Sequence, residues 1–311
     1  MTTLLITHPD CLQHVNPPGH AEQVARLDHV QSALSESSFD DLLRQPAELA
    51  CEADLLLCHP PAYLEHLQQQ APDQGWVTLD ADTNMSPGSL QAAKRAAGGV
   101  VQAVEAVMAG EADNAFCALR PPGHHAERQK SMGFCLFGNV AIGAKYALEH
   151  GLAERVAIID FDVHHGNGTQ DLLWDEPRTL FASSHQMPLY PGTGAANETG
   201  AHGTILNCPL SEGSGTQALH DAYEGQIFPA IDDFAPDLIL ISAGFDAHRD
   251  DPLAGLNWEV SDFIWLTQRI CDLADRRCKG RIVSALEGGY DLNALAASVA
   301  AHVSVLKERG G

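Results

Sequence analysis

Three polar side chains end one apolar segment of this sequence at alternate positions. Asp160, Asp162 and His164 follow the run Val-Ala-Ile-Ile and precede a Gly-Asn-Gly turn. Because residues two apart in an extended chain lie on the same face, these side chains would point the same way. Together with Asp246, which ends a second apolar run, the segment offers two carboxylates and an imidazole, a set that binds Zn²⁺ and leaves a position open for water. A lone Asp-x-His would more often cap a turn, but this combination predicts a catalytic metal site.

Amide hydrolysis needs two further groups beside such a metal, a base for water and a donor for the developing oxyanion. His124 and His125 follow a rigid Arg-Pro-Pro-Gly turn, and either imidazole could serve as the base. Tyr290 follows two glycines and could donate its hydroxyl to a substrate carbonyl. A His-His pair is often incidental and a single Tyr usually packs in a core. Their assignment as catalytic groups therefore depends on their position beside the predicted metal site.

Short apolar runs alternate with amphipathic stretches along the chain. The predicted strands are Leu4–His8, Asn114–Leu119, Val156–Asp162, Thr179–His185, Leu238–Asp246 and Arg281–Glu287. The predicted helices are Ser89–Met108, Asn139–Glu149, Ser261–Cys278 with Ser261 as N-cap, and Leu295–Glu308. This alternation is typical of an α/β fold, with a mostly parallel sheet covered by helices on both faces. Polar clusters follow five of the strands, at the edge where such sheets bind ligands.

No linker-like segment divides the chain, so we expect a single catalytic domain over residues 1–311. The 8 cysteines are scattered without a Cys-x-x-Cys pair, which predicts neither a disulfide framework nor a thiolate zinc site. Residues 1–10 lack the basic and apolar regions of a signal peptide. No apolar run reaches the roughly 20 residues that span a bilayer. We therefore expect a cytoplasmic protein without a membrane partner.

The charge balance is strongly acidic, with 18 Lys and Arg against 41 Asp and Glu and a formal net charge of −23. Such a surface repels nucleic-acid phosphates, so we expect no nucleic-acid partner. It would favour cationic substrates such as polyamines or lysine-rich peptides. Many soluble proteins are acidic for solubility alone, however, so this preference carries little weight by itself.

The motifs together resemble the histone deacetylase and acetylpolyamine amidohydrolase family of the arginase/deacetylase superfamily, in its class II and bacterial form. They extend over essentially the whole chain: His14–His20 with Arg26-Leu27, Asp82-Thr83, Arg120–Ala126, Gly133–Cys135, Asp160–Gln170, Pro191–Gly194, Gly244–Leu253 and Leu286–Leu292. The resemblance implies one α/β domain with a mainly parallel eight-stranded sheet flanked by helices. It also implies a zinc-dependent deacetylase that removes acetyl or related acyl groups from acyl-lysine in a narrow tube, releasing acetate and a free amine.

The resemblance implies two bound ions. One Zn²⁺ per chain would be held by Asp162, His164 and Asp246. A structural K⁺ would bind nearby, through the Ser183 hydroxyl and the backbone carbonyls of Asp160, Asp162, His164 and Ser184. Fe²⁺ could occupy the zinc ligands in the cell, because the affinity order of metals alone does not decide which one is bound.

The resemblance also assigns roles to the catalytic groups. His125 would be the base for water, and His124 its electrostatic partner or the acid for the leaving amine. Asp160 would orient His124. Asn167 would orient His125, where class I enzymes have an Asp, and the neutral amide would change the basicity of His125. Tyr290 would polarise the scissile carbonyl.

Five residues match positions that contact substrate in the family. Phe134, with Gly133 before it, and Tyr190 would line the tube, although aromatic residues of this kind equally often pack in a core. Most relatives have Phe in place of Tyr190, so this tube would be more polar. Leu253 matches the gate at the tube mouth. Asp82 matches a rim residue that binds the substrate backbone in some relatives, and a surface carboxylate without that role fits its position equally well.

Three alternatives remain open. The substrate could be an acetylated polyamine or another small amide. Leu253 favours acyl-lysine, because acetylspermidine-specific relatives have an acidic residue there, whereas the net charge points the other way. The chain could be a non-catalytic scaffold with the same fold, but the presence of a suitable residue at every catalytic position disfavours this alternative. An arginase would need a two-manganese carboxylate cluster, which the His124-His125 pair and Tyr290 do not suit. The sequence leaves the oligomeric state undecided.

Overall fold

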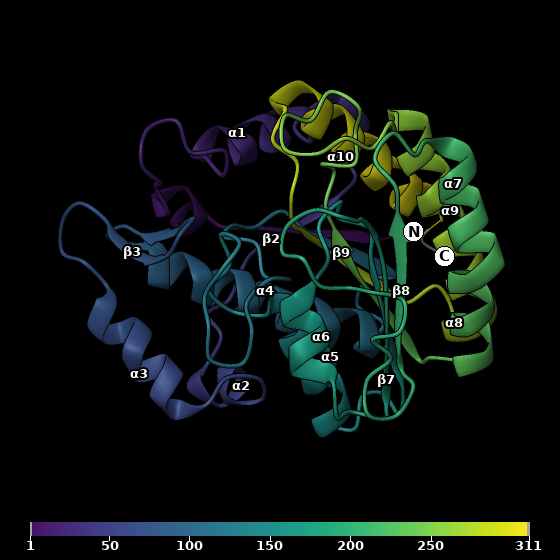
Figure 1. Ribbon diagram of the computed structural model, residues 1–311, viewed down its shortest axis with the longest axis horizontal. Helices are drawn as coiled ribbons and strands as arrows, with labels where there is room; N and C mark the ends of the chain where they lie inside the picture. The colour runs from purple at the N-terminus through teal and green to yellow at the C-terminus, as the bar shows by residue number, and fades with distance from the viewer. Residues whose placement is uncertain (1, 310–311) are drawn as a thin grey trace.

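Eight strands form one parallel sheet at the centre of the computed structural model, which describes residues 2–309 (Figure 1). The strand order is β2-β1-β5-β10-β9-β6-β7-β8. The strands are β1 (Thr3–Thr7), β2 (Leu43–Pro46), β5 (Asn114–Cys117), β6 (Val156–Asp160), β7 (Thr179–Gln186), β8 (Ile205–Leu210), β9 (Leu238–Ala243) and β10 (Ile282–Leu286). A separate antiparallel hairpin joins β3 (Val77–Asp80) to β4 (Thr83–Met85). The expected α/β fold with an eight-stranded parallel sheet is confirmed.

Helices cover both faces of this sheet (Figure 1). They are α1 (Val24–Ala33), α2 (Glu52–Leu56), α3 (Pro61–Gln70), α4 (Ser89–Ala109), α5 (Asn139–Glu149), α6 (Asn167–Leu173), α7 (Thr216–Ala222), α8 (Phe228–Phe234), α9 (Val260–Cys278) and α10 (Leu292–Arg309). On one face α4 and α5 pack together and against the central strands, and on the other α9 and α10 pack together with α1 beside α10. None of the helices within residues 2–309 is both long enough and apolar enough to cross a membrane.

The two central strands β6 and β9 explain why the polar clusters meet. Both consist of buried residues along their whole length, as expected for parallel strands covered on both faces. Their register pairs Asp160 with Ser242. The segments that follow, with Asp162 after β6 and Asp246 after β9, therefore leave the same edge of the sheet side by side.

All six predicted strands and all four predicted helices are present, with ends that differ by a few residues. The prediction that Ser261 caps its helix was wrong. Helix α9 begins at Val260 after the N-cap Glu259, whose backbone N–H donates to the carboxylate of Asp262 at 2.8 Å. Because this capping interaction forms two residues earlier, Ser261 lies inside the first turn.

A buried ion-pair network joins α1 to the loop after β5. Glu22 is fully buried and accepts hydrogen bonds from Arg120 Nη2 at 2.6 Å and from Arg26 Nη1 at 3.0 Å. Burial alone would raise the pKa of Glu22, but Arg120 and His14 outweigh it and hold that pKa well below its usual value. The carboxylate is thus ionised, and it fixes the start of the loop that leads to His124.

Candidate functional site

Two carboxylates and an imidazole converge at the carboxyl edge of β6 and β9. Asp162, His164 and Asp246 are buried, and each offers a ligand atom within 4.8 Å of the others. Nδ1 of His164 lies 3.2 Å from Asp162 Oδ1 and 3.1 Å from Asp246 Oδ2. Within the described part of the chain, this is the one group of three such residues close enough to hold a metal ion.

The electrostatics of this group fit a divalent cation. Burial, followed by the charge of Asp162, raises the pKa of Asp246, so the negative charge of Asp162 disfavours ionisation of Asp246. Burial would lower the pKa of His164, but the two carboxylates raise it to about 10. A cation between the three groups would offset this repulsion. Three protein donors are also the number that leaves a metal position open to water or substrate.

Two glycines allow the backbone to approach these carboxylates. A Cβ on Gly244 would lie 2.0 Å from Asp162 Oδ2, and one on Gly288 would lie 2.2 Å from Asp246 Oδ2. The N–H of Gly288 donates to Asp162 Oδ2 at 2.8 Å. Any larger residue at either position would therefore displace a candidate ligand.

The tandem histidines are each oriented by a polar partner. Nδ1 of His124 lies 3.0 Å from Asp160 Oδ2, and Nδ1 of His125 lies 2.7 Å from Asn167 Oδ1. The amide nitrogen of Asn167 donates to Glu127 Oε1 at 2.7 Å, which fixes the amide so that its oxygen faces the imidazole. Because that oxygen can only accept, His125 carries its proton on Nδ1. The Nε2 of a neutral His125 is then free to accept a proton.

The two imidazoles are pushed in opposite directions by their surroundings. Burial would lower the pKa of His124, but the carboxylates of Asp162 and Asp160 outweigh it and hold that pKa well above its usual value. Burial lowers the pKa of His125, and the charges of His124 and His164 lower it further, to well below the usual range. Two neighbouring titratable groups whose pKa values are shifted apart in this way supply one proton donor and one proton acceptor.

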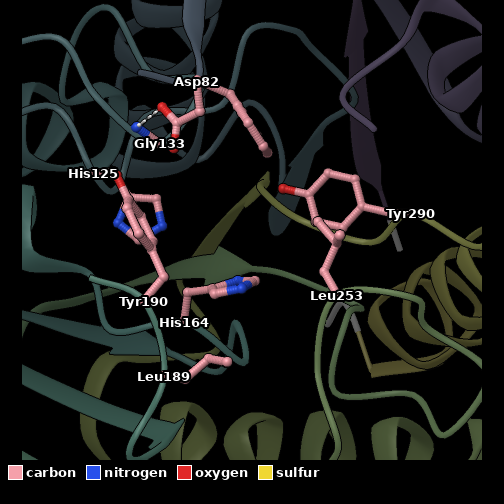
Figure 2. A pocket seen from close by; sticks show the side chains of 9 residues that line it. Asp82, His125, Gly133, His164, Leu189, Tyr190, Leu253 and Tyr290 are labelled. Atoms are coloured by element: carbon pink, nitrogen blue, oxygen red, sulfur yellow. Dashed lines mark hydrogen bonds between the residues drawn. The ribbon is translucent and has the colours of Figure 1, made fainter. Parts of the chain in front are cut away.

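Tyr290 faces the histidines across the site. Its hydroxyl points into the space between the side chains, opposite His125 (Figure 2). Burial raises the pKa of Tyr290 well above its usual value, with Arg26 only partly opposing it. The Arg26 guanidinium lies 4.8 Å from the centroid of the Tyr290 ring. The phenol is therefore neutral and can donate a hydrogen bond.

His125, His164 and Tyr290 border a cavity of about 260 Å³ (Figure 2). Its lining residues are Asp82, His125, Gly133, Phe134, His164, Leu189, Tyr190, Leu253 and Tyr290. The five residues expected to contact substrate are all among them, although their roles stay predictions. Leu189 was not expected. Tyr190 and Leu253 are 38% and 37% exposed, which places them at the open end.

The wall containing Phe134 has an unusual backbone. Gly133 and Phe134 have φ angles of 55° and 69°, a left-handed conformation that is costly for an aromatic residue. The N–H of Gly133 donates to Asp82 Oδ1 at 3.1 Å, and that of Phe134 donates to Thr83 Oγ1 at 3.0 Å. The turn of the β3–β4 hairpin thus holds Phe134 against the cavity.

The polar side chains at the end of β7 do not line this cavity. His185 is not part of the cavity lining: its ring centroid is 4.7 Å from that of His165. The hydroxyl of Ser183 bonds to His185 Nδ1 at 2.9 Å, and that of Ser184 bonds to the Tyr223 hydroxyl at 3.0 Å. The K⁺ site expected around Ser183 and Ser184 stays a prediction.

Three carboxylates support the site without having been assigned a role from the sequence. Glu127 orients the amide of Asn167. Glu287 is buried and accepts hydrogen bonds from the N–H groups of Gly123 at 2.6 Å and His124 at 3.1 Å. Asp251 bonds to the backbone of two residues that line the cavity. Their position within or beside the motifs could have drawn attention to these carboxylates. The sequence does not show, however, which groups they bind.

Comparison with known proteins gives consistent matches. A model of the histone deacetylase domain matches residues 20–306. A probable deacetylase of Archaeoglobus fulgidus is 38% identical over 299 residues, which cover 94% of this chain and 82% of that protein. A histone deacetylase-like amidohydrolase of Pseudomonas aeruginosa is 39% identical over 284 residues, covering 89% and 74%. The crystal structure of the HDA15 HD domain superposes with a TM-score of 0.93 at 32% identity, covering 99% of this chain and 88% of that one.

Proposed function

Because the chain belongs to the histone deacetylase family, we propose that it is a zinc-dependent hydrolase that removes acetyl groups from acyl-lysine side chains. One observation carries the proposal. His164, one of the three candidate metal ligands, lines the same cavity as His125 and Tyr290. We propose that residues 1–311 act as one catalytic domain.

Asp162, His164 and Asp246 would hold the metal. When bound, a divalent ion polarises the amide carbonyl and lowers the pKa of water. The mixed carboxylate and imidazole donors suit Zn²⁺, and Fe²⁺ would use the same atoms. Metal analysis of the protein from its native host distinguishes the two.

The remaining steps belong to the side chains of the chain itself. Nε2 of His125 accepts a proton from water as the water oxygen bonds to the acyl carbon. The Tyr290 hydroxyl donates a hydrogen bond to the carbonyl oxygen, which gains negative charge as the C–O bond becomes single. His124, oriented by the carboxylate of Asp160 3.0 Å from its Nδ1, acts as the electrostatic partner that stabilises this charge. One of the two protonated imidazoles, His125 with the proton it took from water or His124, then gives a proton to the amine nitrogen. The C–N bond breaks, the carbonyl re-forms, and acetate and a free amine leave.

The cavity favours an acyl-lysine over a polyamine. Phe134 and Tyr190 line the cavity with aromatic rings suited to an aliphatic chain, and Leu253 at the open end gives a second ammonium group no partner. Asp82, the one acidic residue of the lining, is engaged by the Gly133 N–H. The net charge of −23 is the observation that favours a polyamine.

The substrate class is tested by turnover of two compounds by the zinc-loaded protein. An acetyl-lysine peptide and an acetylated polyamine are compared at equal concentration, each with a chelated control. We expect chelator-sensitive release of acetate, with kcat/KM about tenfold or more higher for the peptide. In Leu253→Glu, the added carboxylate should shift the preference toward the polyamine. Faster cleavage of the polyamine by the unaltered protein would assign the alternative substrate. If zinc is bound and neither compound is cleaved, the protein either acts on a different acyl group or is a non-catalytic scaffold.

A further inference from the structure

The turn that presents Tyr290 is held by charged side chains from distant segments. Residues 288 and 289 are both glycine, and Gly289 has a φ of 118° that other residues rarely adopt. Consecutive glycines allow many backbone conformations, so the tyrosine needs external restraint. Arg26 Nε donates to the Gly289 carbonyl at 2.6 Å, and the Tyr290 N–H donates to Asp251 Oδ2 at 2.7 Å.

Asp251 connects this turn to the mouth of the cavity. Its second carboxylate oxygen, Oδ1, accepts the N–H of Leu253 at 2.9 Å. One side chain thus fixes the backbone of two lining residues, Leu253 and Tyr290, which lie on the same side of the cavity (Figure 2). The carboxylate is buried, and within residues 2–309 it forms no ion pair with a cation. Burying a carboxylate whose partners are backbone N–H groups is costly, which argues for a specific use.

We propose that Asp251 is a positioning residue for hydrolysis, which sets the distance between the Tyr290 hydroxyl and the substrate carbonyl. The inference rests on the proposed function, in which Tyr290 donates to that oxygen. A hydrogen bond to a developing oxyanion depends steeply on distance and angle. Loss of the restraint should therefore reduce kcat far more than it changes KM.

The test compares two variants of Asp251 with a neighbouring control. Asp251→Ala removes both acceptor oxygens and should lower kcat about 100-fold, with zinc content unchanged and KM within about twofold. Asp251→Asn retains one acceptor oxygen and should lie between alanine and the unaltered protein. Asp250→Asn is the matched control, because the Asp250 side chain is 64% exposed and its ion-pair partner is His248, 3.7 Å away. It should retain full turnover.

A double-mutant cycle separates positioning of Tyr290 from a general structural role. Single-turnover rates are measured for Tyr290→Phe with and without Asp251→Asn. This near-isosteric change keeps the cycle usable even where alanine impairs folding. If Asp251 acts through the tyrosine hydroxyl, its substitution should cause little further loss once that hydroxyl is absent.

Two outcomes would overturn the inference, and they differ from failure of the proposed function. Equal fold-losses from Asp251→Asn in the unaltered and Tyr290→Phe backgrounds would show that Asp251 acts independently of Tyr290. Full kcat in both Asp251 variants would show that the restraint is not needed. Normal turnover by Tyr290→Phe alone would instead contradict the proposed mechanism itself.

Discussion

Tyr290→Phe should lower kcat by about 100- to 1,000-fold, the usual cost of removing one oxyanion donor, while the metal stays bound. The substitution removes a single oxygen atom. The ring keeps its place 4.8 Å from the Arg26 guanidinium and 5.8 Å from the Phe134 ring centroid, so neither the fold nor the cavity wall should change. The loss should therefore reflect the missing hydrogen bond to the carbonyl oxygen.

The measurement is steady-state hydrolysis of an acetyl-lysine peptide, with zinc content determined on the same sample. Tyr146→Phe is the matched control, because the Tyr146 hydroxyl bonds to Glu105 at 2.5 Å on the outer side of α4 and α5. That variant loses the same oxygen far from the cavity and should retain normal turnover. Near-normal turnover in Tyr290→Phe would exclude Tyr290 from the mechanism.

Asp246→Ala should lose both the metal and the activity. The substitution removes one of three candidate ligands and also the acceptor that holds the Val163 N–H at 2.9 Å. Loss of an outer partner of a metal ligand costs roughly 10- to 100-fold in metal affinity, and loss of a ligand itself should cost more. Turnover should fall together with zinc occupancy.

Zinc per chain is measured after dialysis against a mild chelator, and thermal unfolding reports whether the variant is folded. Asp250→Ala removes an exposed carboxylate four residues away and should keep about one zinc per chain, as expected for a single three-ligand site. Full zinc occupancy in a folded Asp246→Ala protein would mean that Asp246 is not a ligand.

The convergence of the site could be predicted because it follows from the sheet. Parallel strands with buried apolar residues end at one edge, so polar residues that directly follow them must meet there. Asp162, His164 and Asp246 do so, with ligand atoms within 4.8 Å of one another. The residue types then limit the chemistry, because carboxylates and imidazole together are metal ligands.

The two edge strands of the sheet, β2 and β8, could not be predicted from the sequence because they lack a continuous apolar run. Strand β2 has the sequence Leu-Arg-Gln-Pro, and most of its residues are exposed. Strand β8 contains Asn207 and Pro209. Strand β8 is mostly buried, but its polar residue and its proline interrupt the apolar run. Neither edge strand therefore has the continuous apolar run that identified β6 and β9.

The supporting carboxylates were also beyond prediction, because their partners are set by tertiary structure. Asp251 binds the N–H of Tyr290, 39 residues further along the chain. Glu287 binds the N–H of Gly123, 164 residues earlier. Backbone N–H groups are the same at every position, so no sequence pattern shows which of them a buried carboxylate will bind.

In the proposed function, one metal ion held by Asp162, His164 and Asp246 makes this chain an amide hydrolase. The most direct test adds Zn²⁺ stepwise to metal-free protein and measures acetate release from an acetyl-lysine peptide at each step. We expect the rate to rise in proportion to bound zinc, to reach a plateau at about one ion per chain, and to return to baseline with chelator. Acetate release that is independent of metal, or none at all with one zinc bound per chain, would contradict it.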